Sequence, residues 1–482
     1  MIYLDIDSHD FENDIRVMTL AFYLGERIVT EHSDDARYLL CIRVGSLEGG
    51  YAGYVRAEGL EHSFERTPGG DHKAIRNDLK RTLYGIFSTL TGKILPWGTL
   101  TGIRPCKIPL SLIEQGLDMD AIIRHMRDEY LASPAKVRIS YDVAATENRV
   151  LAGIDYANEY SLYVGIPFCP TTCLYCSFTS YYIGAWKDRV DEYLDALIKE
   201  LKYIAERNTG RKLTSIYLGG GTPTTLEGPQ LERLLTFINE HFDISDIRER
   251  CVEAGRPDSI TREKLLAIKS CGFERISINP QTMNDKTLRL IGRQHDSRQV
   301  EEAFYMARDC GFPDINMDLI VGLPGEGLEE LQVTLDKVEE FAPENLTIHS
   351  LAVKRAARLN TSYEESIYKP LTDISHMAES DTFMTYAEER ADAMGYIPYY
   401  LYRQKNMAGN LENVGYAKPG KEGIYNIAIM EEKQTIWAAG AGAQSKIVFP
   451  GDRVERCENV KNVEDYITRV DEMIERKAAF LE

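Results

Sequence analysis

Three closely spaced cysteines have the clearest chemistry in this chain. Cys169, Cys173 and Cys176 are separated by three and then two residues, and they follow the apolar run 161–167, which predicts a strand. A loop after that strand could wrap the three thiolates around one metal centre. Structural zinc takes four ligands, and ordinary iron–sulfur clusters take four cysteines. The trio therefore indicates a cluster in which one iron stays open for another ligand.

Zinc is the main alternative, and it needs a fourth ligand. No further histidine or cysteine lies nearby at a spacing that zinc sites use. The other six cysteines are scattered singly, which favours free, buried thiols in a reducing compartment over disulfides. They are Cys41, Cys106, Cys251, Cys271, Cys310 and Cys457.

A glycine-rich segment follows the next apolar run. The sequence Gly219-Gly-Gly-Thr-Pro223 contains more glycine than a strand-to-helix turn needs. Because glycines let backbone groups approach a ligand closely, Gly220, Gly221 and Thr222 are candidate ligand contacts. An ordinary turn is the alternative interpretation.

Charged and polar residues accompany the later apolar runs. Glu253 ends one of them, where a carboxylate suits the hydroxyl groups of a sugar. Arg293 could bind a ligand carboxylate through two parallel hydrogen bonds, with Gln281 as a polar neighbour. Asp318 lies within a very apolar run, where a buried carboxylate without a partner is costly. A structural hydrogen bond is the alternative to a binding role for Asp318.

The segments that position these residues alternate in pattern from residue 161 onward. Apolar runs predict strands at 162–166, 215–218, 251–254, 275–279, 315–321 and 346–351. Amphipathic segments between them predict helices at 190–206, 230–241, 261–270, 299–310 and 328–341. This alternation predicts an α/β fold of parallel strands with right-handed crossovers, either an open doubly wound sheet or a partial barrel. In both, ligands bind at the carboxyl ends of the strands.

The flanking residues predict two further domains around this core of residues 156–360. Residues 1–155 predict an N-terminal α+β domain, with strands at 1–6, 36–44 and 51–57 and a turn at 45–50. Its helices are predicted at 72–90, 107–114, 118–129 and 134–152. Residues 361–482 predict a C-terminal mixed α/β domain, with helices at 376–394 and 463–480 and an aromatic segment at 396–402.

The composition excludes some classes of partner. The chain has 482 residues, 44% hydrophobic and 27% charged, as expected for a globular protein with an ordinary core. A net charge of −19 argues against nucleic acid held by electrostatics and against an anionic membrane surface. The acidic N-terminus has no signal-peptide pattern, and no apolar stretch approaches the roughly 18–20 residues that span a bilayer. We therefore expect a cytoplasmic protein without a membrane span.

The cysteine spacing resembles that of the radical S-adenosylmethionine (SAM) enzymes, for which CxxxCxxC after the first strand of a β/α repeat is a specific signature. The resemblance implies a [4Fe-4S] cluster held by Cys169, Cys173 and Cys176, with SAM on the fourth iron. In these enzymes an electron from the cluster cleaves SAM to methionine and a 5′-deoxyadenosyl radical, which abstracts a hydrogen from the substrate. An external one-electron donor of the flavodoxin or ferredoxin type is implied as a partner.

Taken in order, the motifs resemble the oxygen-independent coproporphyrinogen III oxidase family. The match covers 161–351, and 440–445 extends it, while the segment 96–105 looks like the HemZ branch of Gram-positive bacteria. The family implies a partial (β/α)6 TIM-like radical SAM barrel, followed by a HemN-like C-terminal domain, and one or two SAM molecules. By this resemblance the residues that contact SAM are Tyr163, Tyr175, Gly220, Gly221, Thr222, Glu253, Gln281, Arg293 and Asp318.

The family converts coproporphyrinogen III to protoporphyrinogen IX in haem biosynthesis, so a tetrapyrrole substrate is implied. Lys354, Arg355 and Arg358 could bind its propionates, and a solvated helix start is the alternative. Two positions depart from the family pattern, because Gly165 replaces a histidine and Phe178 replaces an extra cysteine. These departures leave two alternatives open, a haem-binding chaperone of the same family and a radical SAM methyltransferase acting on a tetrapyrrole.

Overall fold

The computed structural model describes residues 1–7, 9–23, 26–33, 37–57, 59–351, 374–404, 411–451 and 453–481. The predicted substrate-binding cations Lys354, Arg355 and Arg358 lie outside the described residues. The chain divides into two compact units, residues 1–144 with 402–412 and residues 145–401 with 413–482. The domain boundaries after residues 155 and 360 stay predictions.

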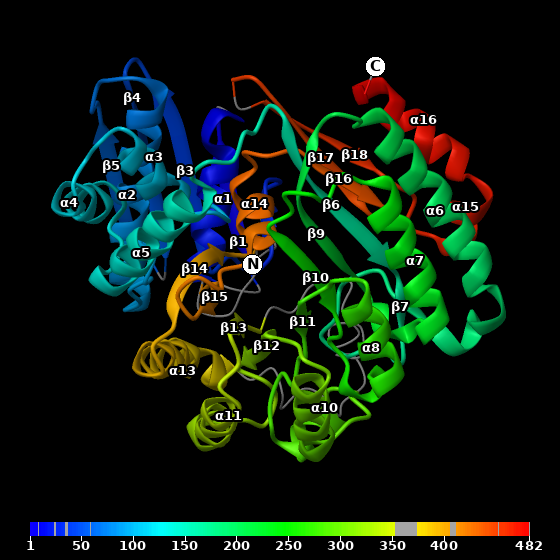
Figure 1. Cartoon of the computed structure of the whole chain (residues 1–482). Helices are drawn as coiled ribbons and strands as arrows, with labels where there is room; N and C mark the ends of the chain where they lie inside the picture. The colour runs from blue at the N-terminus through cyan, green and yellow to red at the C-terminus, as the bar shows by residue number, and fades with distance from the viewer. Residues whose placement is uncertain are drawn as a thin grey trace. The chain divides into compact units, whose positions relative to one another are not determined.

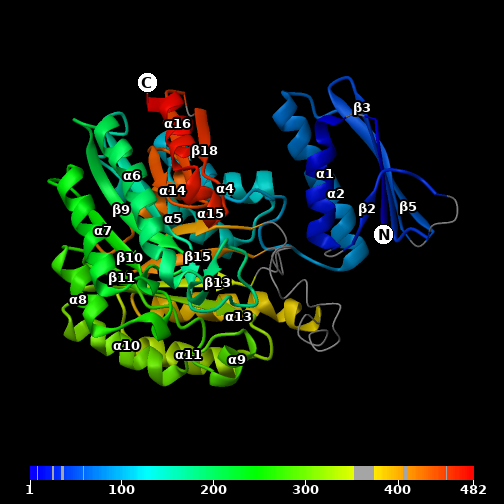
Figure 2. The ribbon, with the colours of Figure 1, turned by 90° about the vertical axis from the view of Figure 1, so that its right-hand side faces the viewer.

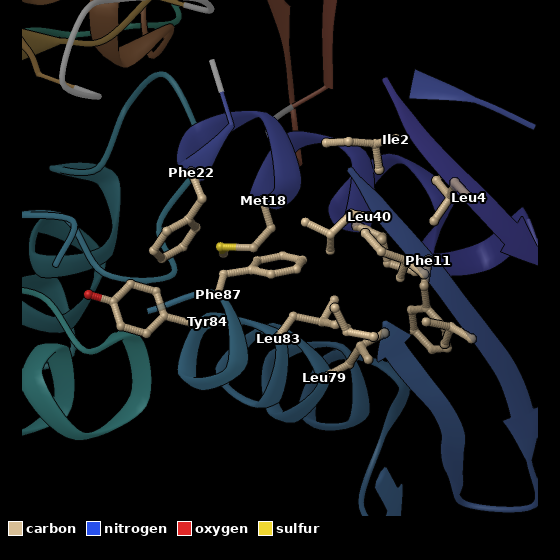
Figure 3. Packing of buried hydrophobic residues seen from close by; sticks show 14 of the residues in the cluster. Ile2, Leu4, Phe11, Met18, Phe22, Leu40, Leu79, Leu83, Tyr84 and Phe87 are labelled. Carbon is tan, nitrogen blue, oxygen red and sulfur yellow. The ribbon is translucent and has the colours of Figure 1, made fainter. Parts of the chain in front are cut away.

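A five-stranded sheet packed against two helices forms the described core of the first unit. The strands lie in the order β2 (Ile28–Val29), β1 (Ile2–Ile6), β3 (Leu40–Leu47), β4 (Gly50–Ala57) and β5 (Leu60–Arg66). Helices α1 (Glu12–Phe22) and α2 (His72–Thr91) lie side by side against this sheet (Figure 2). Phe22 of α1 and Phe87 of α2 meet in the buried core (Figure 3). The predicted α+β character of this unit is confirmed.

The structure of the first unit differs from the prediction at residues 45–50, at β5 and at α1, and the local sequence explains each difference. The glycines of residues 45–50 predict a long turn, but Ser46 and Leu47 pair with Tyr51 and Gly50 in a tight hairpin. Sequence patterns do not predict β5, because it is mostly exposed and lacks an apolar alternation. They also miss α1, whose acidic first turn reads as a polar segment although acidic residues stabilise helix starts.

The segment 402–412 belongs to the first unit, and buried polar contacts hold its two ends there. Arg403 donates from Nη1 to the carbonyl oxygen of Leu100 at 2.6 Å. Glu412 accepts a hydrogen bond from the indole of Trp97 and pairs with Lys136, whose side chain is buried. The three helices predicted after α2 are present as α3 (Lys107–Glu114), α4 (Met119–Tyr130) and α5 (Pro134–Leu151).

An 11-stranded sheet organises the described part of the second unit. At its centre, parallel strands lie side by side in chain order: β6 (Glu159–Ile166), β9 (Lys212–Gly220), β10 (Glu249–Glu253), β11 (Arg275–Ser277), β12 (Asp314–Val321) and β13 (Asn345–Ser350). A doubly wound sheet reverses its strand order at one point, and this order does not reverse. The arrangement is the predicted partial (β/α)6 barrel.

Helices follow one another along the outside of these strands (Figure 1). They are α6 (Val190–Arg207), α7 (Gly228–His241), α8 (Arg262–Ser270), α10 (Ser297–Asp309) and α11 (Leu328–Phe341). The outward side chains of the strands are apolar and fully buried beneath them, as at Leu162, Ile216, Val252 and Ile276. Burial of this face drives the strands and helices together.

The C-terminal part of the chain extends both edges of the sheet. β16 (Ile436–Ala439) lies parallel to β6 and is followed by the antiparallel β17 (Gln444–Phe449) and β18 (Arg453–Glu458). At the other edge, β15 (Asn413–Ala417) pairs with β13, and the aromatic segment forms β14 (Ile397–Tyr402) beside it. The helices are α13 (Ile374–Ala393), α14 (Ile424–Glu431), α15 (Val463–Thr468) and α16 (Val470–Leu481), so the single helix predicted over 463–480 is two. Among the described residues, no helix is both long enough and apolar enough to cross a membrane.

Candidate functional site

The inward-facing side chains of the parallel strands are mostly polar. Strand register places Tyr163 beside Tyr217 and Asp318 beside Thr347. In a typical closed barrel the interior is filled with branched apolar side chains. Here the side chains of Asp318 and His349 are 22% and 25% exposed. This barrel interior is therefore suited to a polar ligand rather than to a packed core.

A buried ion-pair group lies at the amino-terminal end of the barrel interior. Arg275, at the start of β11, lies 3.5 Å from carboxylate oxygens of both Glu249 and Asp314. Its Nη1 also donates to the carbonyl oxygen of Lys421 at 2.9 Å, just before α14. These contacts lie at the amino-terminal end of the strands, whereas the cysteine loop lies at the carboxyl end.

The cysteine loop, residues 168–182, begins and ends in a small two-stranded sheet. β7 (Phe168–Cys169) pairs with β8 (Tyr181–Tyr182), so the loop is closed at its base, just after β6. Cys173 is buried, and Cys169 and Cys176 are half-buried. The pKa of Cys176 is raised to about 11, chiefly by burial and in smaller part by Cys173 and Cys169. Its thiol therefore stays protonated until a metal displaces the proton.

The glycine-rich turn after β9 is bonded directly to the backbone that leads into Cys169. Gly221 donates its N–H to the carbonyl oxygen of Ile166 at 2.8 Å, and Thr222 donates to that of Phe168 at 2.7 Å. A Cβ atom on Gly221 would lie only 2.4 Å from the Phe168 oxygen. The Thr222 hydroxyl lies 3.5 Å from the sulfur of Cys169. Close packing thus requires glycine at 221, and Thr222 reaches the first cysteine.

Glu253, at the end of β10, is a carboxyl group with a raised pKa. The hydroxyl of Tyr217 donates to its Oε1 at 2.6 Å. Burial raises the pKa of Glu253 to about 7, and the charge of Asp318 adds to the rise, while hydrogen bonds from Tyr217 and Gly220 oppose it. The pKa of Asp318 is lowered, because its interactions with His349 outweigh burial. One interior thus holds two carboxyl groups that ionise at different pH values.

Three tyrosine rings stack beside Glu253. The rings of Tyr217 and Tyr425 are 4.5 Å apart, and Tyr163 lies 6.2 Å from Tyr425 and 6.4 Å from Tyr217. All three rings are within 20° of parallel, so they form one stacked aromatic group. Sequence patterns point to Tyr163 alone, although the alternation that places Gly219 inward also places Tyr217 there.

Arg293 ties the cysteine loop to the ends of two strands. Its Nη2 donates to the hydroxyl of Tyr175 at 3.1 Å, and its Nη1 donates to the carbonyl oxygens of Asn279 and Gly255 at 2.8 and 3.3 Å. Its Nε is buried, and no hydrogen-bond partner for it lies in the described part of the chain. An orphaned buried donor on a cation is a position at which an anionic ligand group would be stabilised.

Gln281 follows β11 in an unusual backbone conformation. Its φ of 67° is uncommon for a residue other than glycine. Its N–H donates to the carbonyl oxygen of Asp318, and its own carbonyl accepts from Ile320, both at 2.9 Å. Such conformations cluster at functional sites, where the surrounding structure holds them in place.

Sequence patterns also miss two further residues of this site, Arg256 and His349. Nη1 of Arg256 lies 3.6 Å from the sulfur of Cys173, and Nε2 of His349 lies 3.9 Å from the carboxylate of Asp318. An arginine just beyond a strand does not by itself indicate a binding site in the sequence. His349 could have been found from the alternation within β13, which places it on the same face as Thr347.

The surroundings of the thiols fit a cluster. Within the described residues, no three His, Cys, Asp or Glu side chains converge on a position for a single metal ion. A cluster places a different demand on its ligands, because each cysteine binds a separate iron. The hydroxyl of Thr222 and the guanidinium of Arg256 lie next to two of the sulfurs, and such donors stabilise anionic thiolates.

Comparisons with known proteins agree with this geometry. Residues 163–338 match the family model of the radical SAM superfamily. Over 418 residues the chain is 38% identical to the oxygen-independent coproporphyrinogen-III oxidase-like protein HemZ of Bacillus subtilis, an alignment that spans 85% of this chain and 82% of that protein. The chain belongs to the oxygen-independent coproporphyrinogen III oxidase family of radical SAM proteins.

Other members of the family extend the comparison. The haem chaperone HemW of Bacillus subtilis is 32% identical over 308 residues, which are 64% of this chain and 76% of HemW. The solved structure of HemN from Escherichia coli, a coproporphyrinogen III oxidase described as a radical SAM enzyme, is 26% identical with a TM-score of 0.53, covering 67% of this chain and 72% of HemN. The likeness to HemN supports the partial barrel. The cofactors of the radical SAM superfamily are a [4Fe-4S] cluster and SAM.

Proposed function

We propose that this protein converts coproporphyrinogen III to protoporphyrinogen IX without oxygen. Two propionate side chains would become vinyl groups. Each would lose carbon dioxide, one hydrogen atom that the 5′-deoxyadenosyl radical takes up, and one electron that passes to a one-electron acceptor. The observation that carries the proposal is the polar interior of the barrel, together with the cysteine loop that follows its first strand. The name of the HemZ relative supports this substrate.

Three cysteines would hold the cluster in this proposal. Cys169, Cys173 and Cys176 come from one loop, which β7 and β8 close at its base. When bound, the cluster supplies the electron that cleaves SAM to methionine and a 5′-deoxyadenosyl radical. Thr222 would orient the sulfur of Cys169, and the close contact at Gly221 would keep that turn against the loop.

The remaining candidates would bind SAM and orient it. Ionised Asp318 and partly ionised Glu253 would accept hydrogen bonds from ribose hydroxyls and favour the positive sulfonium group. Arg293 would hold Tyr175 at the edge of the cluster and present its positive charge to the carboxylate of SAM. The other proposed contacts are Tyr163, Gly220, Gly221, Thr222 and Gln281.

Two positions bear on the choice of substrate. A Cβ atom at Gly165 would lie 3.3 Å from the carbonyl oxygen of Ala439 and 3.4 Å from the ring of Tyr163, so the histidine of the family pattern would be packed closely against both. Phe178, at the position of the family's extra cysteine, is 71% exposed. The radical chemistry needs neither replaced residue, whereas the placement of a porphyrinogen depends on both positions.

A haem chaperone is the second candidate function. The chain is 32% identical to the haem chaperone HemW. Phe178 favours this candidate, because it removes a cysteine and exposes a flat aromatic ring two residues after Cys176. An exposed ring of this kind could pack against the face of a haem.

Anaerobic product analysis separates these functions. The reconstituted protein is mixed with SAM, coproporphyrinogen III and dithionite, which replaces the expected flavodoxin- or ferredoxin-type donor. The proposal predicts 5′-deoxyadenosine together with vinyl products by mass spectrometry, both absent in Cys173→Ser. 5′-Deoxyadenosine without a vinyl product would refute the substrate assignment. A methylated tetrapyrrole would indicate a methyltransferase, and haem binding without SAM turnover would select the chaperone. Phe178→Cys shows whether the missing cysteine limits decarboxylation.

A further inference from the structure

Arg256, just beyond β10, has all of its hydrogen-bond donors occupied. Its Nε and Nη2 donate to the two carboxylate oxygens of Asp258 at 2.9 and 2.8 Å. Nη2 also donates to the hydroxyl of Thr171 at 3.0 Å, and Nη1 donates to the carbonyl oxygen of Thr171 at 3.2 Å. The last contact runs from Nη1 to the sulfur of Cys173 at 3.6 Å. A guanidinium group has five N–H donors, so these contacts use every one.

The carboxylate of Asp258 fixes the orientation of the Arg256 guanidinium. Arg256 is 3% exposed, and Asp258 meets it with both carboxylate oxygens. The pKa of Asp258 is lowered, because its interactions with His295 and Arg256 outweigh burial. Nδ1 of His295 lies 3.6 Å from Oδ1 of Asp258. A bidentate pair with an ionised carboxylate keeps the planar group in one geometry.

The cysteine loop is held against Arg256 by a second set of bonds. Leu174 donates its N–H to the carbonyl oxygen of Ile291 at 3.0 Å, just after α9 (Asp285–Leu290). The hydroxyl of Thr171 donates to the carbonyl oxygen of Gly292 at 3.3 Å. Residues on both sides of Cys173 are therefore anchored. The backbone at Cys173 cannot move away from Arg256 unless these bonds break.

We propose that Arg256 raises the reduction potential of the cluster through its contact with Cys173, an inference that rests on the proposed function. Reduction adds negative charge to a cluster that cysteine thiolates already make anionic. A buried cationic N–H donor at one sulfur stabilises the reduced form more than the oxidised form. The surrounding protein carries a net charge of −19, which opposes electron entry. Arg256 offsets that charge at the cluster itself and so eases reduction by the external donor.

The midpoint potential of the reconstituted cluster tests this inference. In Arg256→Met, loss of a hydrogen bond from a charged donor should change the reduction equilibrium constant on the order of tenfold. For a one-electron couple this is a downward shift of about 59 mV, measured by a redox titration followed by EPR. Arg250→Met is the matched control, because Arg250 lies on β10 and contacts the carbonyl oxygen of Cys271 instead of the loop. The midpoint potential of the cluster in Arg250→Met should equal that in the unmodified protein.

Further variants separate charge from loop structure. Arg256→Lys keeps a positive charge and should recover part of the shift, so a potential equal to that of Arg256→Met would contradict a charge effect. If Arg256→Met does not fold or does not bind iron, Arg256→Gln is titrated instead and must show the downward shift. An unchanged potential in an iron-loaded neutral variant overturns the inference. Absence of a cluster from the unmodified protein would instead overturn the proposed function.

Discussion

The hydroxyl of Tyr193 on α6 donates to the carbonyl oxygen of Gly165 on β6 at 2.6 Å. The same hydroxyl accepts the N–H of Ala441 at 3.1 Å. One side chain thus joins the strand that leads to the cysteine loop with a turn from the C-terminal part of the chain. Gly440 precedes that turn with a φ of 109°, and a Cβ there would lie 2.5 Å from the Gly165 oxygen. This close approach explains the glycine at position 440.

A buried ion pair holds the same junction. Lys477 of α16 donates to Oε1 of Glu200 on α6 at 2.6 Å, and both side chains are fully buried. Oε2 of Glu200 accepts the N–H of Gly440 at 2.9 Å, and Oε1 accepts the side-chain amide of Asn459 at 2.8 Å. The last helix of the chain is therefore linked through α6 to the strand that positions the cluster.

Lys477→Met should destabilise the protein strongly. The change leaves the carboxylate of Glu200 buried without its cation, which typically costs about 3–5 kcal/mol of unfolding free energy. Lys199→Met is the matched control, because the pair between Lys199 and Asp471 joins the same two helices with side chains 53% and 74% exposed. An exposed pair contributes up to about 1 kcal/mol. Urea denaturation measures the unfolding free energy of both variants. An equal loss of unfolding free energy in the two would contradict a special role for the buried pair.

Cys173→Ser should abolish stable binding of the cluster. A serine hydroxyl replaces one of the three proposed thiolate ligands, so iron and sulfide per chain should fall well below the level of the unmodified protein. Cys310→Ser is the control, because Cys310 is equally buried at 8% exposure but lies outside the loop. Equal iron retention in the two variants would show that the loop does not hold the cluster.

Glu253→Gln should change how stability depends on pH. The pKa of Glu253 is raised from 4.5 to about 7 in the folded protein, so the folded state binds this proton more tightly than the unfolded state. Its contribution is complete below about pH 4.5 and is lost as the pH rises through about 7.

Relative to Glu253→Gln, the protein without cofactors should therefore lose up to about 3 kcal/mol of unfolding free energy between about pH 5 and pH 8. Chemical denaturation at the two pH values measures the difference. Glu232→Gln removes an exposed glutamate of α7. Its unfolding free energy should differ from that of the unmodified protein by the same amount at both pH values. A constant difference for Glu253→Gln as well would contradict the raised pKa.

Gly221→Ala should disturb the turn next to Cys169. The added Cβ would lie 2.4 Å from the carbonyl oxygen of Phe168, so the turn must shift, at a cost of about 1–3 kcal/mol. Uptake of iron should be slower or incomplete. Gly85→Ala, on the exposed side of α2 with no atom within 4 Å, is the control and should gain about 0.5–1 kcal/mol. Normal stability and iron content in Gly221→Ala would refute the close packing.

Sequence patterns predicted the parallel core because its strands and helices have strong local periodicity. The cysteine loop and the glycine-rich turn were also recognisable, since each is a continuous segment of chain. The contacts of Arg256 with Cys173 and of Tyr193 with Gly165 were not, because they join residues 83 and 28 positions apart. Nothing local distinguishes Arg256 from other arginines. Only the folded chain shows which arginine faces a thiol.

Contacts that are distant in sequence also could not be predicted for Arg293, although the motifs did identify this residue. Its sequence context predicts a partner for a ligand carboxylate, but three of its N–H groups already donate to Tyr175 and to two backbone oxygens. Sequence patterns also treat 463–480 as one helix, because the apolar spacing continues across the break at Arg469. Local patterns thus locate elements and motifs, while tertiary packing decides which donors remain available.

The central claim is that the cysteine loop holds a [4Fe-4S] cluster whose open iron binds SAM. EPR of the dithionite-reduced protein, recorded with and without SAM, tests it most directly. We predict the signal of one reduced [4Fe-4S] cluster per chain, with g values that change on addition of SAM, and no such signal in Cys173→Ser. A missing signal, or one that saturating SAM leaves unchanged, would contradict the account.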